Sequence, residues 1–516
     1  MCYDLILETK ASQTDVTLPH QLQLCPALPS IIGSKDYANF DRELTRIDEL
    51  LGSSEVESLF LRLSVERLQA EAKHSLSDTD IARHREQSRV ALRCEILRTL
   101  LGQESYRNMS QRLAESARCR QFCGIDALDR VRVPSKSRLQ TYTKWLPEEQ
   151  MREVLTQLLR GASTQGGSER MGLAARIEFD LVLMDTTCLK ANIHFPVDWV
   201  LLRDAARTLL KATMLIRKRG ICERMEPPET FLSRMNKLCI GMAMAGRKHD
   251  SKRQKKTFLR AMKKLIDIIA AHARRHRAAL DKQWAETDLT RGRTEQILRR
   301  IDGICERLTA IKKQAHERII GERQLANTDK ILSLYENEIH LINRGKSGAT
   351  FEVGNTLHIA EQKDGIIIDH KLFKAMSAGD AKILCGSIAR IEDMDIAPIM
   401  QVSTDKGFST QGTRKLLARK GIFDATCPRD PSEHARRQKE DPIFAAAQKR
   451  RAQTEGKIGN IKNDFLGRIL RVKGYENRAA AVSFAILAHN LRKIARLPQK
   501  QTGEKEFIED DELMAA

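Results

Sequence analysis

The chain has 516 residues, and 88 lysines and arginines against 68 aspartates and glutamates give it a formal net charge of +20. That length is enough for roughly two to four domains with cores of their own. The charge favours an anionic partner, nucleic acid before an acidic membrane. No apolar run is long enough to span a bilayer, and the start Met1-Cys-Tyr-Asp4 lacks the basic residues of a signal peptide. We therefore expect no membrane partner and a soluble protein, cytoplasmic or nucleoid-associated.

The 11 cysteines are scattered and odd in number, which is typical of reduced thiols. Cys119 and Cys123 form a lone C-x3-C pair, so two buried helix cysteines are favoured over a zinc site. His272 and His276 have the spacing of one helix face, but arginines surround them. A solvated basic face is therefore favoured there over a metal site.

The first third of the chain reads as helical. Residues 1–37 are irregular in pattern, and residues 38–165 show apolar residues at helical spacing, for example in 90–101 and 105–113. Pro134 and Ser135 cap a further helix that runs to Leu146. Its basic residues are Lys136, Arg138 and Lys144. A helix-turn-helix-like DNA reader and an ordinary small helical domain both fit this pattern.

Residues 161–170 resemble a linker because they are rich in Gly and Ser. The first clear strand follows at about 176–186, and Asp185 ends its apolar run. Residues 199–340 are then almost wholly helical in pattern and rich in Lys and Arg. The cluster at 247–256 fits either a phosphate path or a solvated helix face.

The pattern changes to short strands after residue 347. The expected elements are strands at 348–353, 357–360 and 365–369, a helix at 378–388, a strand at 397–405, a helix at 411–419, a strand at 421–426 and helices to 496. An acidic tail, 497–516, ends the chain. Without the helical interruption this is a mixed sheet flanked by helices, the α/β class in which sites form at strand ends.

Three acidic residues in unlike settings suggest one metal site. Asp185 and Asp405 each end an apolar run, and Glu455 lies in a helix-like stretch. Two neighbouring divalent ions need shared carboxylates, and Mg²⁺ prefers oxygen ligands. Taken singly, each acid also fits a turn or a surface ion pair. The rival carboxylates are Asp198, Asp369, Asp395 and Asp424, of which Asp424 is the strongest.

Arg451, Glu455 and Lys462 have the spacing of a single helix face. A carboxylate beside two cations suits a metal next to a phosphate backbone, and an amphipathic helix with ordinary ion pairs is the alternative.

These residues resemble the DDE transposases of bacterial insertion sequences, whose catalytic fold is RNase H-like. Several separate stretches carry the resemblance: Asp185-Thr-Thr187, Asn192-Ile-His-Phe-Pro-Val-Asp198, Arg344-Gly-Lys346 with Phe351-Glu-Val-Gly354, Thr404-Asp-Lys-Gly-Phe408, Arg451 with Glu455 and Lys462, and Leu487-Ala-His-Asn-Leu-Arg-Lys-Ile494. Phe122 and Pro134-Ser-Lys-Ser137 are similar to the DNA-binding front end of these enzymes. The likeness covers most of residues 85–496.

Two features depart from the family pattern. Gln448 stands where the family has a tyrosine that precedes Arg451 by three residues, in a region that contacts DNA ends in related enzymes, so that contact is not carried over to Gln448. The insertion follows the first strand and is helical, whereas better-known relatives carry a strand-rich insertion before the glutamate helix. Roles known for that other insertion are therefore not carried over.

The resemblance implies an enzyme that binds the ends of its element and performs metal-dependent DNA cleavage and strand transfer. Asp185, Asp405 and Glu455 would hold two Mg²⁺ (or Mn²⁺) ions. The residues expected to contact DNA are Arg451, Lys462, Lys406, Lys136, Arg138 and Lys144. The implied partners are double-stranded DNA and further copies of the chain, in a homodimer or higher oligomer in a bacterial cytoplasm. The alternative is a domesticated or inactive transposase-derived DNA-binding protein.

The expected domains follow from the resemblance and the helical pattern together. They are a helical DNA-binding domain at 38–165, an RNase H-like catalytic domain at 170–198 and 341–496, and a helical insertion at 199–340.

Overall fold

The computed structural model describes residues 28–125, 130–245, 251–346, 349–452, 459–467 and 470–500, with the backbone alone at 344–346, 349 and 350. Glu455 lies outside the described residues, as do most of the expected irregular N-terminus and of the acidic tail. Within the described part, no helix is both long and apolar enough to cross a membrane.

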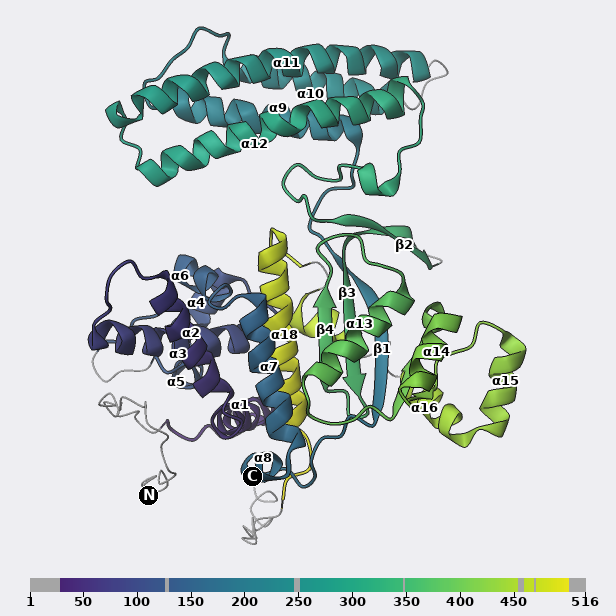
Figure 1. Cartoon of the computed structure of the whole chain (residues 1–516). Helices are drawn as coiled ribbons and strands as arrows, with labels where there is room; N and C mark the ends of the chain where they lie inside the picture. Colours follow the sequence, from purple (N-terminus) through teal and green to yellow (C-terminus); the bar gives the residue numbers. More distant parts are fainter. Residues whose placement is uncertain are drawn as a thin grey trace.

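The described strands form one mixed sheet (Figure 1). They are β1 (Leu181–Lys190), β2 (His340–Lys346), β3 (Ala349–Gln362), β4 (Ile367–Leu372), β5 (Gln401–Thr404) and β6 (Phe423–Asp424). Their order is β2-β3-β1-β5-β6, and β4 also pairs with β3. Strand β3 is antiparallel to β1, β2 and β4, whereas β1, β5 and β6 are parallel. A mixed sheet flanked by helices agrees with the expected α/β class.

Gly354 is the residue at which β3 pairs with both β1 and β2. It is level with Lys190 of β1 and with His340 of β2. A Cβ atom at Gly354 would lie 2.0 Å from the carbonyl oxygen of Leu189. Only glycine allows this close approach of two backbones, so Gly354 fixes where the long strand crosses from one partner to the next.

The N-terminal helices and the sheet share one hydrophobic core. These helices are α1 (Lys35–Ser53), α2 (Val56–Glu71), α3 (Asp78–Leu100), α4 (Tyr106–Glu115), α5 (Ala117–Cys123), α6 (Lys136–Tyr142), α7 (Glu148–Ser163) and α8 (Gln165–Arg170). The core runs without a break from Leu50 and Leu158 in these helices to Val182 and Leu357 in the sheet.

Helix α18 (Tyr475–Ala495) lies between the N-terminal helices and the sheet (Figure 1). All of its residues from Ala479 to Leu491 are buried, as expected for a helix that is covered on every side. The Asn490 side chain donates to the carbonyl oxygen of Ile367 at 2.8 Å and accepts from its N–H at 2.9 Å. This pair of bonds satisfies the backbone at the start of β4 and holds α18 against the sheet.

The remaining helices of this body cover the other parts of the sheet. They are α13 (Asp380–Asp393), α14 (Gln411–Arg419), α15 (Pro431–Glu440) and α16 (Pro442–Ala452). Helices α14, α15 and α16 lie beyond the β5–β6 edge (Figure 1). Phe444 and Ala447 of α16 pack with Ala425 in a small separate core.

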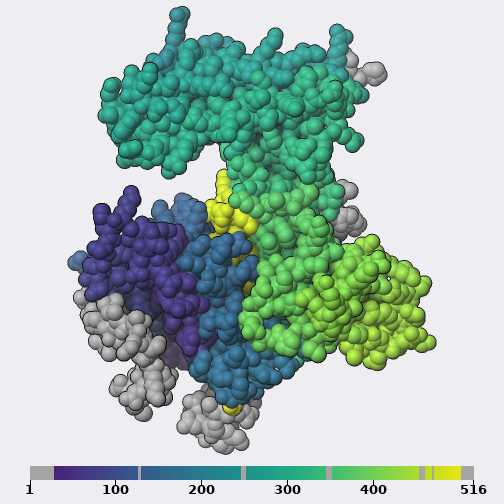
Figure 2. Space-filling view, viewed as in Figure 1, coloured from purple at the N-terminus to yellow at the C-terminus, as the bar shows by residue number. Residues whose placement is uncertain are grey.

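A bundle of four long helices follows β1 in the sequence. The helices are α9 (Asp198–Arg217), α10 (Pro228–Ala245), α11 (Ser251–Gln283) and α12 (Arg291–Ala315), and they enclose their own hydrophobic core. The bundle extends over the N-terminal helices, and Figure 2 shows an open notch between the two.

Charged side chains stabilise the base of the bundle and the segment that returns from it to the sheet. Asp198 accepts from Arg318 at 2.8 Å and from Gln314 at 2.8 Å. On the returning segment, Glu336 forms an ion pair with Arg478 of α18, and the Arg478 Nε donates to Asn355 of β3 at 3.0 Å. Removing one partner of a buried pair is costly, so these contacts fix the two chain segments that connect the bundle.

Three local expectations were wrong. Residues 161–170 are not a linker but the end of α7 and all of α8, and a Cβ at Gly167 would lie 2.2 Å from the Gly161 carbonyl oxygen. Close packing, not chain freedom, explains these glycines. The strands expected at 348–353 and 357–360 are one strand, β3, and the capped basic helix ends at Tyr142 rather than at Leu146.

His276 also differs from the expected solvated face, because it is buried. Its Nε2 lies 3.3 Å from the N–H of Glu223. Cys119 and Cys123 are buried free thiols in α5, which confirms their interpretation as helix cysteines.

Candidate active site

Asp185 of β1 and Asp405, which directly follows β5, come next after the paired residues of these two parallel strands. The last aligned pair between β1 and β5 is Met184 with Thr404, so the next residue of each strand is an aspartate. Adjacent strands are about 4.8 Å apart and residues in register point to the same face. Strand β1 itself continues to Lys190, with Asp185 paired to Ile359 of β3, so Asp185 stands at the end of the β1–β5 ladder rather than at the end of its strand.

Both aspartates are partly exposed, and each is fixed by the backbone that follows it. Asp185 Oδ1 accepts from the Thr186 N–H at 2.6 Å. Asp405 Oδ1 accepts from the Lys406 N–H at 2.7 Å and caps the short 3₁₀ turn Lys406–Phe408. These bonds restrict the rotation of the two carboxylates.

Lys462 reaches the same face of β1. Its Nζ donates to Thr187 Oγ1 at 3.1 Å, and Thr187 follows Asp185 by two residues, so both side chains lie on one side of the strand. Lys406 is exposed directly after Asp405. Two of the predicted phosphate contacts are thus beside the two aspartates.

Arg451, near the end of α16, lies close to Asp405 through Cys427. Burial raises the pKa of the Cys427 thiol, while Arg451 lowers it and Asp405 raises it. The Cys427 N–H donates to the Thr404 carbonyl oxygen at 3.0 Å, which continues the β5–β6 pairing past Asp424. Cys427 is therefore level with Asp405 on the third parallel strand.

Gln448 anchors α16 to these strands. Its buried side-chain amide donates to Ser403 Oγ at 3.3 Å and to the Ala425 carbonyl oxygen at 2.5 Å, and its Oε1 accepts from Arg451 Nε at 3.2 Å. The sequence identified Gln448 as a departure from the tyrosine of the family. It did not predict that Thr187 or Cys427 would lie near the two aspartates.

Glu455 belongs to the segment 453–458, which lies outside the described residues. The chain on either side of that segment contacts the strands of both aspartates, through Gln448 before it and Lys462 after it. Within the described ranges, no three His, Cys, Asp or Glu side chains are grouped as metal ligands. Asp185 and Asp405 supply two carboxylates, the oxygen chemistry that Mg²⁺ or Mn²⁺ requires.

Two rival carboxylates are engaged in structural ion pairs. Asp198 holds Arg318 at the base of the bundle. Asp369 is buried and accepts from Arg390 at 2.6 and 2.9 Å. Burial would raise the pKa of Asp369, but the hydrogen bonds and charge of Arg390 outweigh it and lower that pKa below its usual value.

The other two alternative carboxylates, Asp395 and Asp424, do not lie at the end of the β1–β5 pairing. Asp395 is an exposed turn residue with φ of 49°. Asp424 is level with Val402, two residues before Thr404, and its Oδ1 accepts from the Thr426 N–H at 2.9 Å. Asp424 therefore stabilises the turn after β6.

The predicted DNA-contacting residues of the front end lie apart from these aspartates. Lys136, Arg138 and Lys144 are exposed on or beside α6, on the other side of the sheet from α16 (Figure 1). The Ser135 hydroxyl accepts from the Arg138 N–H at 3.3 Å, as expected for a cap. The Arg138 guanidinium lies 5.5 Å from the Trp145 ring centre, which orders its side chain.

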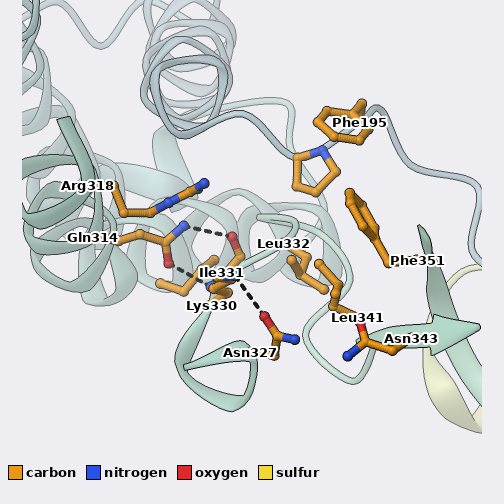
Figure 3. A pocket seen from close by; sticks show the side chains of 11 residues that line it. Phe195, Gln314, Arg318, Asn327, Lys330, Ile331, Leu332, Leu341, Asn343 and Phe351 are labelled. Carbon is orange, nitrogen blue, oxygen red and sulfur yellow. Dashed lines mark hydrogen bonds between the residues drawn. The ribbon is translucent and has the colours of Figure 1, made fainter. Parts of the chain in front are cut away.

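The stretch that follows β1 forms part of two pockets at the base of the bundle. Phe195 and Pro196 line the larger one, of about 650 Å³, together with Gln314 and Arg318 of the bundle side and Phe351 of β3 (Figure 3). The Phe195 and Phe351 rings are 5.9 Å apart. Phe351 precedes the β3 partner of Asp185 by eight residues, roughly 26 Å of strand. His194 lines the neighbouring pocket, so this stretch is remote from Asp185.

Comparison with known proteins gives one family. Residues 410–495, from α14 to the end of α18, match the family model of the transposase DDE domain. No curated protein and no solved structure matches the chain. The matched segment includes α16, the position of Glu455 and Lys462. The match confirms the resemblance to DDE transposases over residues 410–495, the segment of this chain that is similar to the transposase DDE domain.

Proposed function

We propose that this protein is a transposase that binds the ends of its own insertion element and catalyses metal-dependent cleavage and strand transfer of double-stranded DNA. The observation that carries the proposal is the level placement of Asp185 and Asp405 on parallel strands. The family match of residues 410–495 covers the position of Glu455.

In this proposal, Asp185, Asp405 and Glu455 hold the metal ions. Two Mg²⁺ or Mn²⁺ ions bound there would activate the attacking oxygen and stabilise the leaving oxygen of the phosphodiester. Lys462, Lys406 and Arg451 bind the phosphates on either side of the cleaved bond, and arginine can do so with two parallel hydrogen bonds. No protein nucleophile is required.

The sheet supports an RNase H-like catalytic domain built from residues 170–198 and 341–496. Its order β4-β3-β1-β5-β6, with β3 the antiparallel member, fits that fold. We assign recognition of the element ends to residues 38–165, through Lys136, Arg138 and Lys144. The bundle, 199–340, is the insertion. Assembly as a homodimer or higher oligomer on DNA, in a bacterial cytoplasm, completes the proposal.

The test is cleavage of linear DNA that carries an element end, with Mg²⁺ and with EDTA. Asp185→Asn, Asp405→Asn and Glu455→Gln should each abolish cleavage and leave DNA affinity largely intact, because each removes a metal ligand and no basic residue. Mg²⁺ should also raise the thermal midpoint of the wild type, since a ligand that binds only the folded state stabilises it. Asp185→Asn and Asp405→Asn should reduce that shift.

Asp424→Asn is the matched control, because it removes a carboxylate from the neighbouring strand that does not reach the ladder end. Full cleavage by Asp185→Asn or Asp405→Asn would remove that residue from the site. DNA binding without cleavage by the wild type would favour a domesticated or inactive DNA-binding protein instead.

A further inference from the structure

The notch between the bundle and the N-terminal helices ends in a basic corner. Helices α9 and α12 border it on the side of the bundle, and the start of α18 is at its inner end (Figures 1 and 2). A pocket of about 410 Å³ lies in this corner, lined by residues of α9, by 192–197, by 332–336 and by Lys473. The sequence pattern gave this part of the bundle no particular role.

Three exposed cations line the pocket: Arg207 and Lys211, one turn apart on α9, and Lys473 just before α18. Among the described residues, none of the three forms an ion pair with an acidic side chain. The acidic residues of the same pocket are already paired, Asp204 with Arg203 at 3.1 Å and Glu336 with Arg478. The corner therefore keeps an uncompensated positive charge.

An aromatic side chain is held among these cations. Tyr335 is 53% exposed, and its hydroxyl lies 2.5 Å from Thr208 Oγ1 of α9. The Lys473 ammonium is 6.0 Å from the centre of the Tyr335 ring. These contacts order Tyr335 and Lys473 before any ligand binds, which lowers the entropy lost on binding.

On the bundle helices α11 and α12, ion pairs with acidic side chains compensate part of the positive charge. Lys252 and Lys256 of α11 bind Glu322 at 2.9 and 2.8 Å, and Lys312 of α12 binds Asp267 at 2.5 Å. The lower boundary of the notch is the upper edge of the N-terminal helices, where α6 lies (Figure 1). Exposed Lys136 and Lys144 belong to that region. Both boundaries of the notch thus carry exposed cations.

We propose that the bundle and the N-terminal helices bind a single DNA duplex in the notch between them. In this proposal, Arg207, Lys211 and Lys473 bind its phosphate backbone. This inference rests on the proposed DNA-directed function and adds the surface that the insertion contributes. Lysine and arginine contacts to phosphates position a duplex without reading its sequence. The α9 side of the notch therefore supplies affinity for any duplex. Discrimination of element ends is a property of the N-terminal helices.

The test compares two full-length double variants that remove the same charges at the same spacing. Arg207→Gln with Lys211→Gln changes the notch, and Arg260→Gln with Lys264→Gln changes the exposed face of α11, which lies on the far side of the bundle (Figure 1). The logarithm of DNA affinity falls linearly with the logarithm of salt concentration, by about one unit of slope for each phosphate contact. The notch variant should lose about two units of slope and the α11 variant none.

Equal slopes of the salt dependence for the two variants would overturn the contact of Arg207 and Lys211 with DNA. The basic corner would then fit an acidic protein segment instead. Unchanged circular dichroism and thermal midpoints verify that both variants fold. A wild type that binds no duplex would instead reject the proposed function itself. Titration with a short duplex tests whether each chain binds a single duplex. A stoichiometry above one duplex per chain that falls in the notch variant would contradict that part of the proposal.

Discussion

Gln448 shows how one substitution changes the use of a position. Where DDE transposases have a tyrosine, this chain has a glutamine whose side chain is buried against Ser403 and Ala425. Its carbonyl oxygen accepts from Arg451. Gln448 therefore holds α16 and Arg451 against the strand that precedes Asp405.

We predict that Gln448→Leu lowers the rate of strand cleavage by about 100-fold at saturating DNA, the loss expected when a catalytic group moves by about 1 Å. DNA affinity should change little, because no cation is removed. Single-turnover cleavage and equilibrium binding, measured on the same DNA, separate these two effects.

Gln438→Leu is the control for this prediction. Gln438 and Gln448 both line a groove between α15 and α16, but the Gln438 side chain is exposed. Its variant should cleave at the wild-type rate. A fall in affinity with an unchanged cleavage rate for Gln448→Leu would mean that Gln448 contacts DNA after all.

At the scale of elements, a buried polar cluster joins two strands to two helices. Asp369 of β4 binds Arg390 of α13 and, at 3.2 Å, Arg152 of α7. The adjacent His358 of β3 and His370 of β4 are both buried. Burial lowers the pKa of His358 to about 4 and that of His370 to about 3.

These two histidines should make the main body sensitive to acid. Their unfolded pKa is about 6.5, so below that pH the unfolded chain binds protons that the folded chain excludes. Stability is fully present above about pH 6.5 and is lost as pH falls, until about pH 4 for His358 and about pH 3 for His370. Each histidine costs about 1.4 kcal/mol per pH unit in its window.

Urea midpoints measured between pH 7.5 and pH 4.5 test this prediction. His370→Gln should flatten the dependence on pH, whereas the same change at His74, an exposed histidine, should leave it as in the wild type. Parallel curves for all three proteins would show that His370 titrates alike in the folded and unfolded chains.

At the scale of the whole molecule, the chain has two large and separate cores. One includes the N-terminal helices, the sheet and α18, and the other lies inside the bundle. The expected front-end domain at 38–165 has no separate core, because its apolar residues continue into the sheet. The N-terminal helices and the sheet therefore share one hydrophobic core.

We predict two thermal transitions in calorimetry. Ile269→Ala, in the bundle core, should lower one of them, and Ile486→Ala, in α18, should lower the other, each through a loss of about 2–5 kcal/mol. Each variant is the control for the other. A single transition that both variants shift alike would mean that contacts such as the ion pair of Glu336 with Arg478 couple the two cores completely.

The sequence by itself determined the local features of this protein. Apolar runs that end in Asp185 and Asp405 predicted two strands, and apolar periodicity predicted the long helices of the bundle. The motifs predicted the family that the comparison confirms. These features depend on residues near one another in the chain, so a single sequence displays them.

Only the tertiary structure decided how distant segments meet. The alignment of β1 with β5, which brings Asp185 level with Asp405 across more than two hundred residues, depends on strand register and not on either motif. Asp198 and Asp369 ceased to be candidates because Arg318 and Arg390, far along the chain, neutralise them. Gly161 and Gly167, linker residues by composition, allow two helices to pack closely. Each outcome depends on how separate strands and helices pack, which neither apolar periodicity nor composition displays.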